Sequence, residues 1–308
     1  MSPTKPHAPP PDESSRPPLA SLIISSRNRH AFVSEAVCSV LAGEHVPAEL
    51  IVVDQSDDRH PDLERLETKR ECELRYLWTN ERGASRGRNM GIRSARHPIV
   101  LFIDDDCRVT PTWLVALTRA IVRAGERTVV TGRVIAGDAE VADGFAPSVI
   151  EHGLPAEYSG RQWRDVLYSN NMGFFKSAVD AVGLFDERLG AGAHFPSSED
   201  NDFCFRLLEA GYRIRYAPEA VVTHRAWRTS GAYLPLQWAY GRGQGAYYAK
   251  HLRREDRYML RRLVWEIANK TRRGIRGLVR ERRQAAGHLV FAAGVVAGAA
   301  EWIVSRPQ

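Results

Sequence analysis

The sequence of 308 residues has few cysteines and no paired cysteine motif. Its four cysteines are widely separated along the chain: Cys38, Cys72, Cys107 and Cys204. Without a CxxC pair or the dense cysteines of a small secreted domain, the sequence predicts neither a structural zinc site nor a disulfide scaffold. The N-terminus also lacks a basic stretch followed by an apolar run, as a signal peptide would have. We therefore expect a protein of the reducing cytoplasm.

A long uninterrupted apolar run is missing as well. The apolar stretch 289–304 contains Glu301 and is shorter than the roughly 20 residues that span a bilayer. It predicts a docked or interfacial helix. The first 18 residues are rich in proline and polar side chains, which is typical of a disordered tail.

After this tail, short apolar runs alternate with segments of helical periodicity. We expect strands at 19–25, 49–54, 73–78, 99–103, 128–135, 212–216 and 220–224, and helices at 30–41, 61–70, 84–95, 111–124, 177–182 and 199–210. The segment 137–168 predicts a long loop or lid. The alternation predicts an α/β fold with a Rossmann-like, mostly parallel sheet, helices on both faces and ligands at the carboxyl ends of the strands. We expect a catalytic domain over 19–233 and a basic helical extension over 234–308.

Three consecutive carboxylates, Asp104, Asp105 and Asp106, directly follow the apolar strand at 99–103. Neighbouring carboxylates repel each other, and a hard divalent cation such as Mg²⁺ or Mn²⁺ relieves that repulsion while also binding substrate phosphates. An isolated acidic trio is also compatible with a solvated turn or a helix cap. Its surroundings decide between these interpretations.

Four motifs occur in a specific order: the strand end Ser25-Ser-Arg-Asn-Arg29, the strand end Asp54-Gln-Ser56, the segment Gly83-Ala-Ser-Arg-Gly-Arg-Asn-Met-Gly-Ile92, and the acidic trio. This order resembles the family-2 glycosyltransferases of GT-A fold. The resemblance implies transfer of a sugar from a nucleotide-diphosphate donor, with a divalent metal as cofactor. The chain departs from the family where Ser25-Ser-Arg27 replaces a Pro-Thr-Tyr-like sequence and where Gly87 replaces an alanine.

The resemblance implies a role for each matching residue on the donor side. Ser25 and Arg27 would line the base pocket, where the Arg27 guanidinium plane would replace a stacking aromatic ring. Asp54 would accept a hydrogen bond from the base, and Arg88 would face the donor phosphates. Asp104 would contact the ribose and Asp106 the metal, with Asp105 also in the donor site; the alternatives for Asp54 and Arg88 are a strand-end turn and a surface cation.

The second half resembles the acceptor side of the same family. The matching segments are Asn170-Asn171-Met-Gly-Phe-Phe-Lys176, Val182-Gly-Leu-Phe-Asp186-Glu187 and the ED motif Glu199-Asp200. The resemblance implies that Asp200 is the general base, with Asn171 and Glu199 on the acceptor side. We expect Asp200 to be ionised, because a helix N-terminus favours negative charge. The alternative is a carboxylate that only caps the helix.

His224 ends the strand 220–224, at a place where many relatives carry a histidine that reaches the metal or the diphosphate. By that resemblance His224 is a candidate metal ligand together with Asp106, and the alternative is a buried structural histidine. The predicted reaction is one direct displacement with inversion, in which Asp200 activates an acceptor hydroxyl.

The net charge of +6 is concentrated near the C-terminus, where 250–283 carries many arginines among Leu, Tyr, Trp and Ile. Amphipathic basic helices of this kind are attracted to anionic lipids. They suggest a peripheral position on the inner face of the cell membrane and a glycan, lipid-linked or small-molecule acceptor. The alternative is a solvated helix packed on the catalytic domain.

Two other functions fit part of the sequence. A sugar-nucleotide nucleotidyltransferase also uses metal carboxylates, but it should have a glycine-rich loop after the first strand, where this chain has Ser25-Ser-Arg-Asn-Arg29. A nucleic-acid-binding protein would use the basic tail, yet the tail contains no recognisable binding module. We therefore expect no nucleic-acid partner, because neither alternative accounts for the ED motif.

Overall fold

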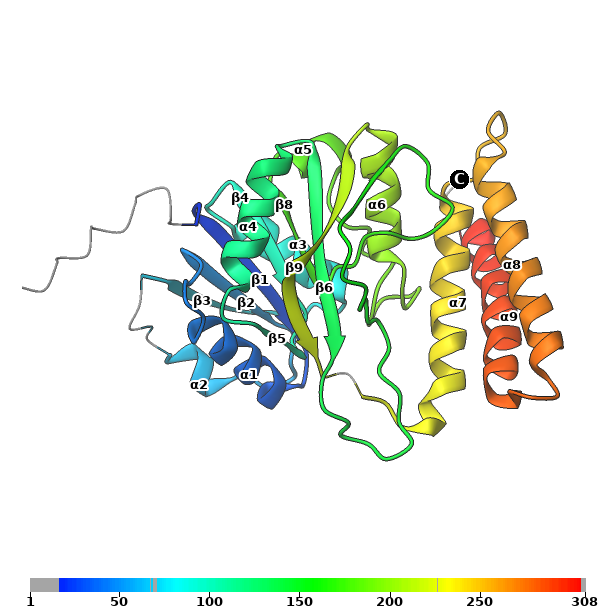
Figure 1. Cartoon of the computed structure of the whole chain (residues 1–308), viewed down its shortest axis with the longest axis horizontal. Helices are drawn as coiled ribbons and strands as arrows, with labels where there is room; N and C mark the ends of the chain where they lie inside the picture. The colour runs from blue at the N-terminus through cyan, green and yellow to red at the C-terminus, as the bar shows by residue number, and fades with distance from the viewer. Residues whose placement is uncertain (1–16, 67, 69–70, 226, 306–308) are drawn as a thin grey trace, which may run out of the picture.

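The computed structural model describes residues 17–66, 68, 71–225 and 227–305. The predicted disordered tail at 1–18 lies almost entirely outside these residues. Within the described part of the chain, nine strands form a single sheet in the order β3-β2-β1-β4-β8-β6-β9-β5, with β7 paired to β9 (Figure 1). The strands are β1 (Ala20–Ser26), β2 (Glu49–Asp54), β3 (Glu73–Trp78), β4 (Ile99–Ile103), β5 (Cys107–Val109), β6 (Thr128–Ala136), β7 (Ala156–Ser159), β8 (Asn171–Phe175) and β9 (Arg213–His224).

The first four strands are parallel, so their carboxyl ends meet at one edge of the sheet. β1 pairs with β2 so that Ser26 lies opposite Asp54, and β4 ends beside them at Ile103. The side chains of β1, β2 and β4 are almost wholly buried on both faces, which explains why these strands appear in the sequence as continuous apolar runs. β8 then runs antiparallel to both β4 and β6. The sheet is therefore mixed and mostly parallel, as predicted.

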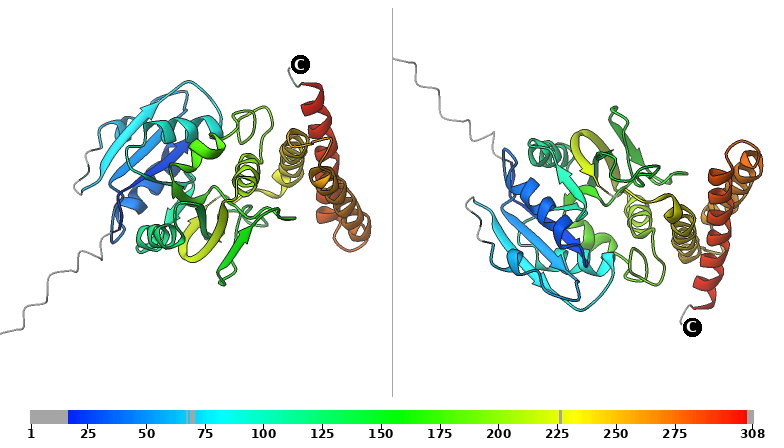
Figure 2. Two further views of the ribbon diagram at one scale, coloured as in Figure 1. Left: turned by 90° about the horizontal axis from the view of Figure 1, so that it is seen from above. Right: turned by 90° about the horizontal axis from the view of Figure 1, so that it is seen from below.

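Helices cover both faces of this sheet. One hydrophobic core forms beneath α1 (His30–Leu41), α2 (Pro61–Glu64) and α4 (Trp113–Ala124), and it includes Val37, Leu117 and Trp113. The second core forms beneath α3 (Ala84–Ser94), α5 (Ala178–Val182) and α6 (Glu199–Glu209), and it includes Phe203. Figure 2 shows the resulting layers from above and below.

The predicted boundaries differ from the structure in four places. β9 is one strand rather than two, because its pairing with β6 continues across a bulge after Gly132. The predicted loop at 137–168 contains the edge strand β7. The strands β5 and β8 were not predicted, since each is short and its pairing comes from distant parts of the chain. The helix predicted over 61–70 is described only at Pro61–Glu64.

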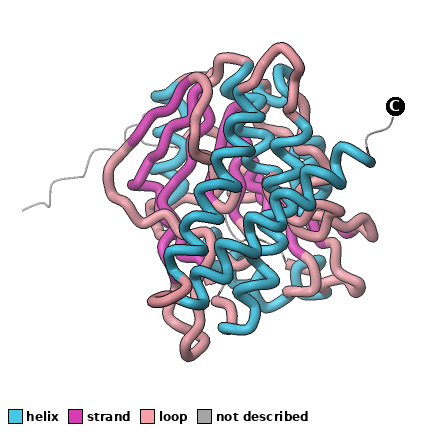
Figure 3. The backbone as a smooth tube through the Cα atoms, turned by 90° about the vertical axis from the view of Figure 1, so that its right-hand side faces the viewer, coloured by secondary structure: helices cyan, strands magenta, loops and turns pink. Residues whose placement is uncertain are grey.

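Beyond β9 and a short 3-10 turn, the chain forms three helices: α7 (Tyr233–Lys250), α8 (Tyr258–Gly277) and α9 (Arg282–Val304). Figure 3 shows the side of the molecule that they cover. The backbones of α7 and α9 are in direct contact. A Cβ atom added at Gly298 would lie only 2.0 Å from the Arg242 carbonyl oxygen. α9 is longer than predicted and is long and apolar enough to cross a membrane by length and composition alone, with 39% of its apolar window buried in the structure. Its packing on α7 agrees with the predicted docked helix.

Candidate functional site

A cavity of about 890 Å³ opens at the carboxyl ends of β1 and β4 and extends to α6. Nine of the residues predicted from the sequence line it: Ser25, Arg27, Arg88, Asp104, Asp105, Asp106, Glu199, Asp200 and His224. Sequence segments nearly 200 residues apart therefore meet in one place. The Arg27 side chain is partly exposed and lies 3.8 Å from Asp57, and its buried Nε has no hydrogen-bond partner among the described residues.

The acidic trio is held by Arg29, which was not among the predicted site residues. Arg29 donates to Asp105 Oδ1 and to Asp106 Oδ2, each at 2.7 Å. Ser26 Oγ also donates to Asp105 at 2.7 Å. Burial, together with the neighbouring Asp106 and Asp104, raises the pKa of Asp105 to about 6 although Arg29 opposes this shift. The trio therefore has distinct members, of which Asp105 is the one buried among structural partners.

Asp106 faces His224 across the end of the sheet. The short strand β5 pairs with the end of β9, so that Cys107 lies opposite His224 and the imidazole reaches the acidic trio. His224 Nε2 lies 3.1 Å from Asp106 Oδ1, and both side chains are almost fully buried. Burial alone would raise the pKa of Asp106, but His224 and Arg29 outweigh it and lower this pKa.

These two side chains fit a divalent cation. His224 Nδ1 lies 3.2 Å from the Pro147 carbonyl oxygen, an acceptor that fixes the proton on Nδ1 and directs the Nε2 lone pair at the Asp106 carboxylate. Two electron-rich atoms in contact require a proton or a cation between them, and Asp106 accordingly raises the pKa of His224 against the effect of burial. Cys107 Sγ completes a cluster within 4.8 Å. Burial keeps it a neutral thiol by raising its pKa, which makes it a poor ligand.

Arg88 links the donor and acceptor halves of the cavity. Its Nη2 donates to Asp104 Oδ1 at 2.9 Å and its Nη1 donates to Glu199 Oε1 at 2.8 Å. The helix α3, which carries Arg88, can lie close to β1 because the residue before Arg88 is Gly87, which has no side chain. A Cβ atom at Gly87 would lie 2.7 Å from Ser25 Cβ, which explains the departure from the alanine of the family pattern.

The ED motif opens α6, as expected, and follows a strained residue. Ser198 has φ +69°, an uncommon left-handed conformation for a residue other than glycine. Its Oγ donates to Gln244 Oε1 at 2.9 Å, and Asn201 Nδ2 donates to the same oxygen at 2.8 Å. Backbone strain that is held by side-chain contacts is common at functional sites. Here the strained residue and Asp200 both line the cavity.

The surroundings of Asp200 oppose the ionised state that we expected from its position at a helix N-terminus. Burial raises the pKa of Asp200 to about 8, and the nearby charge of Glu199 adds to this effect. The charge of Arg88 lowers the pKa but does not compensate. The N-terminal dipole of a helix is worth only about 0.3–1 kcal/mol, which is less than the cost of desolvating a carboxylate. Asp200 is therefore a carboxyl group whose affinity for protons is unusually high.

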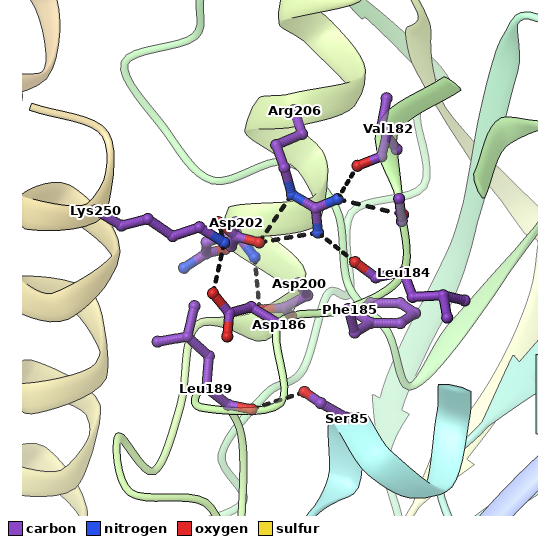
Figure 4. Close-up of polar contacts among 12 residues, drawn as sticks. Ser85, Val182, Leu184, Phe185, Asp186, Leu189, Asp200, Asp202, Arg206 and Lys250 are labelled. Atoms are coloured by element: carbon purple, nitrogen blue, oxygen red, sulfur yellow. Dashed lines mark hydrogen bonds and ion pairs between the residues drawn. The ribbon is translucent and has the colours of Figure 1, made fainter. Parts of the chain in front are cut away.

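A buried ionic network holds α6 in place next to the site (Figure 4). Asp202 is fully buried and contacts Lys250 Nζ at 2.6 Å, His251 Nε2 at 2.7 Å and Arg206 Nη2 at 2.9 Å. Lys250 also contacts Asp186 at 2.8 Å, and Arg206 donates to the carbonyl groups of the 182–184 turn. Burial would raise the pKa of Asp202, but these cations outweigh it and lower the pKa to about 2. The network joins α6 to α7 and to the loop before it.

Two predicted residues do not join the cavity. Asn171 is fully buried beneath β6 and β9, where its Nδ2 donates to the carbonyl oxygens of Arg133 and Ala220 at 2.9 and 2.8 Å. Those carbonyls lie at the bulge between β6 and β9, so Asn171 satisfies backbone groups rather than facing an acceptor. Asp54 accepts from Tyr76 Oη at 2.5 Å and from the Ser56 amide at 2.9 Å, and it is not among the residues that line the cavity.

Several cavity residues were missed because their positions depend on tertiary packing. They are Ser26, Arg29 and Gln55 near the donor end, Asp165 and Tyr168 from the segment 137–168, and Tyr240, Gln244, Glu266, Lys270 and Phe291 from the C-terminal helices. Ser26, Arg29 and Gln55 had a sequence signal, since they lie within the motifs that end β1 and β2. The C-terminal residues had none, since the basic composition of that segment obscures them.

The geometry agrees with comparison to known proteins. The model of "Glycosyl transferase family 2" matches residues 21–180, which is just over half of the chain. The chain belongs to glycosyltransferase family 2. It is therefore an enzyme that transfers sugars, as the order of its motifs predicted. The matched range contains the acidic trio but ends before the ED motif.

Curated relatives cover parts of this glycosyltransferase. A pre-mycofactocin glycosyltransferase of Mycobacterium tuberculosis is 28% identical over 165 residues, covering 50% of this chain and 32% of that protein. A glucosyl-dolichyl phosphate glucuronosyltransferase of Haloferax volcanii is 26% identical over 209 residues, covering 65% of this chain and 66% of that protein. The chain thus spans from about a third to two thirds of the length of these relatives.

Solved structures share the fold over most of the glycosyltransferase chain. A mannosyltransferase from Pyrobaculum calidifontis in complex with GDP-Man and Mn²⁺ superposes with a TM-score of 0.59 and 17% identity, covering 99% of this chain and 80% of that one. The TarS 1-349 structure from S. aureus has a TM-score of 0.53 and 15% identity, covering 91% and 90% of the two chains. The GT-A fold predicted from the motifs is thereby confirmed.

Proposed function

We propose that this family-2 enzyme is a metal-dependent, inverting glycosyltransferase. It transfers a sugar from a nucleoside-diphosphate donor to a hydroxyl group during synthesis of a cell-envelope glycan, a polysaccharide or another glycan. The observation that carries this proposal is that the Asp106–His224 pair and the carboxyl group of Asp200 line one cavity. The pair suits a cation, and the carboxyl group of Asp200 suits proton transfer.

On the donor side, Ser25 and Arg27 bind the base, Asp104 binds the ribose, and Asp106 and His224 hold the metal. When bound, a Mg²⁺ or Mn²⁺ ion would neutralise charge on the leaving diphosphate. Solved structures of the same fold contain UDP, or GDP-Man with Mn²⁺, which supports this type of donor and cofactor. Arg88 keeps Asp104 in position and contributes positive charge to the same region.

On the acceptor side, Asp200 accepts the proton of the attacking hydroxyl group. The acceptor oxygen bonds to the anomeric carbon as the bond from that carbon to the diphosphate breaks, and the proton passes to Asp200 Oδ. A single displacement of this kind inverts the anomeric configuration. Glu199 does not take this role, because its carboxylate is bound to Arg88.

The donor can be identified by thermal-shift measurements with UDP-, GDP- and dTDP-sugars in the presence of Mn²⁺ or Mg²⁺. A donor that binds the folded state raises the melting temperature, and the rise grows with the logarithm of its concentration above Kd. The selected donor should then release its nucleoside diphosphate on turnover. If none of the donors stabilises the protein or is turned over, the proposed function is wrong.

Asp200→Asn tests the catalytic assignment. The amide cannot accept the proton, so transfer should fall by at least about 10²-fold while donor binding persists. Asp180→Asn is a matched control, since Asp180 lies exposed on α5. The anomeric configuration of the product, measured by proton NMR, tests inversion; a product with the donor's configuration would contradict a single displacement.

The family assignment also bears on the two alternative functions. A nucleotidyltransferase or a nucleic-acid-binding protein would not be expected to match a glycosyltransferase model over 21–180. Arg262, which belongs to the basic extension, forms an ion pair of 2.9 Å with Asp165, a residue that lines the cavity. This arginine is therefore directed toward the site and not toward a nucleic acid. Sugar transfer is therefore the function that we retain.

We further propose that α8 rests on the inner, anionic leaflet of the cell membrane and that the enzyme works from the cytoplasm. The side of α8 opposite Glu266 exposes Val264 and Ile275 next to the arginines Arg261 and Arg272. Apolar side chains flanked by cations suit the boundary between headgroups and acyl chains. Such a position would favour a lipid-linked acceptor.

Flotation with vesicles tests this position. The protein should float with vesicles that contain anionic phosphatidylserine at low salt. It should stay at the bottom of the gradient when only neutral phosphatidylcholine vesicles are present. Val264→Ser combined with Ile275→Ser should reduce flotation, because both apolar anchors are lost. Val122→Ser on α4 is a control, since Val122 is also half-exposed. Equal behaviour with both vesicles would remove the membrane proposal and leave the transfer proposal intact.

A further inference from the structure

The cavity that contains Asp200 does not end at the catalytic domain. The three C-terminal helices continue its wall with Leu236, Tyr240 and Gln244 from α7, Glu266 and Lys270 from α8, and Phe291 from α9. In Figure 1 these helices stand beside the sheet, with α7 nearest to it. The helical extension is therefore part of the site and not only an appendage.

Gln244 fixes this wall to the residues around Asp200. Its Oε1 accepts from Ser198 and Asn201, the residues on either side of the ED pair. Its Nε2 donates to Asp165 Oδ2 at 3.1 Å, and Arg262 of α8 donates to Asp165 Oδ1 at 2.9 Å. This chain of hydrogen bonds runs from the start of α6 through α7 to α8, so the helices are positioned relative to the proposed base.

Glu266 and Lys270 lie one turn apart on α8 and face the cavity. Their side chains are only 16% and 21% exposed, and Lys270 Nζ lies 3.9 Å from Glu266 Oε1, too far for a hydrogen bond. Within the described residues, neither side chain has a hydrogen-bond partner, and Lys270 Nζ otherwise lies 4.2 Å from the centre of the Phe291 ring. Burial raises the pKa of Glu266 and lowers that of Lys270, which shows that both charges lack full solvation.

A carboxylate and an ammonium group in this state can both be satisfied by hydroxyl groups. A hydroxyl donates to Glu266, and a neighbouring hydroxyl oxygen accepts from Lys270, so that neither charge stays without a partner. The aromatic rings of Tyr240 and Phe291 add apolar surface for the carbon face of a sugar ring.

The charges around this wall disfavour an anionic group. A carboxylate or phosphate near Lys270 would also meet Glu266 and Asp165; Arg228 lines the same cavity, but Arg262 is already paired with Asp165. Opposite charges that nearly cancel suit a ligand without net charge.

We propose that Glu266, Lys270 and the rings of Tyr240 and Phe291 form the acceptor subsite for an uncharged, hydroxyl-rich sugar. The helical extension then sets which acceptor is used, while the strand ends bind the donor. This inference rests on the proposed function, because it assumes that Asp200 activates a hydroxyl group of the molecule bound here.

Saturation-transfer NMR tests the subsite directly. Methyl glucoside, galactoside and mannoside are compared with the corresponding methyl uronides, with UDP or GDP and Mn²⁺ present. The neutral glycosides should bind in preference to the uronides. Glu266→Gln and Lys270→Met should each weaken glycoside binding by roughly tenfold, which corresponds to the loss of one hydrogen bond to a charged group. Arg272→Met, an exposed position on the side of α8 opposite Glu266, serves as the control.

Each outcome has a definite meaning. Preference for the uronides, no binding of any neutral glycoside at millimolar concentration, or unchanged binding in both variants would overturn the subsite. Nucleotide and Mn²⁺ binding, followed by thermal shift in the same samples, reports separately on the donor site and on correct folding. If nucleotide binding is absent from the wild-type protein, it is the proposed function that fails.

Discussion

The buried Arg88 joins Asp104 and Glu199 in a single bridge, with hydrogen bonds of 2.9 and 2.8 Å from its two terminal nitrogens. The first carboxylate belongs to the proposed donor site and the second to the ED motif, so the guanidinium fixes the distance between the two halves of the reaction. Burial opposes its charge, but the two carboxylates outweigh burial and raise the pKa of Arg88. The residue is thus a permanent cation in the centre of the cavity.

Arg88→Lys should separate the positive charge of Arg88 from its role as a bridge between the two carboxylates. An ammonium group keeps the charge but cannot span both carboxylates as a planar guanidinium does. We expect kcat/KM for transfer to fall roughly a hundredfold, the loss that a small displacement of reacting groups can produce. Arg86→Lys on the same helix is the control, because its side chain is 42% exposed and its ion pairs are 3.5 and 3.6 Å long. Equal effects of the two substitutions would show that the bridge does not position the reaction.

The rate of transfer should depend on pH through Asp200. Only the ionised carboxyl group accepts a proton, and with a pKa of about 8 roughly a tenth of the enzyme is in that form at pH 7. With saturating donor and metal, log kcat/KM for the acceptor should rise with unit slope and level off above about pH 8. A rate that is constant from pH 6 to pH 9 would argue against Asp200 as the base.

Asp200→Asn should also change stability, in the opposite direction from most substitutions. The folded-state pKa of Asp200 lies above the ordinary value of 3.8, so the folded state binds the proton more tightly and loses stability as pH rises from about 4 to 8. Asparagine removes this loss. The variant should therefore melt at a higher temperature than the wild type at pH 8, with a smaller difference at pH 4.

Metal dependence follows from Asp106 and His224. Chelation by EDTA should stop turnover, and excess Mn²⁺ should restore it. Replacement of either ligand, as in Asp106→Asn or His224→Ala, should weaken Mn²⁺ binding in calorimetry by at least about 10-fold to 100-fold. His194→Ala is a matched control, since its side chain is 60% exposed and contacts Glu301 instead. Turnover that is insensitive to EDTA would exclude the metal role.

Much of the donor half could be predicted from the sequence because it depends on local order. A buried parallel strand such as β4 appears as an apolar run, and the residue that follows it must lie at the sheet edge. Asp104 and Asp106 were located in this way. Asn171 was misjudged because its partners, the carbonyls of Arg133 and Ala220, are defined only by a bulge between distant strands. The state of Asp200 was misjudged because burial, not helix position, dominates its pKa.

The acceptor wall could not be predicted at all. Glu266 and Lys270 lie in a segment whose composition suggests solvated or lipid-facing charge. Their inward position depends on the packing of α8 against α7 and α9, which the helical period alone does not give. What distinguishes them from the exposed Arg261 and Arg272 is the side of the helix on which they fall.

Asp202→Asn should destabilise the fold while leaving the cavity residues unchanged. The substitution removes the negative charge that Lys250, His251 and Arg206 share, and breaking a buried ionic network costs about 3–5 kcal/mol. Because the pKa of Asp202 is lowered to about 2, its contribution is present above about pH 4 and is lost as pH falls toward 2. The difference in melting temperature from the wild type should therefore shrink in acid, and Asp180→Asn should show no such trend.

Gly298→Val tests whether the helical extension must pack closely for the acceptor wall to form. A side chain at this position would collide with the Arg242 carbonyl oxygen of α7, since even a Cβ atom would lie 2.0 Å from it. Overpacking costs about 1–3 kcal/mol, and each kcal/mol lowers the melting temperature of a protein of this size by about 2–4 °C. The displaced α9 carries Phe291, so methyl glycoside binding should weaken more than nucleotide binding. Ala300→Val is the control, because Ala300 is exposed on the same helix. Equal glycoside binding by Gly298→Val and the wild type would show that the wall tolerates separation of α7 and α9.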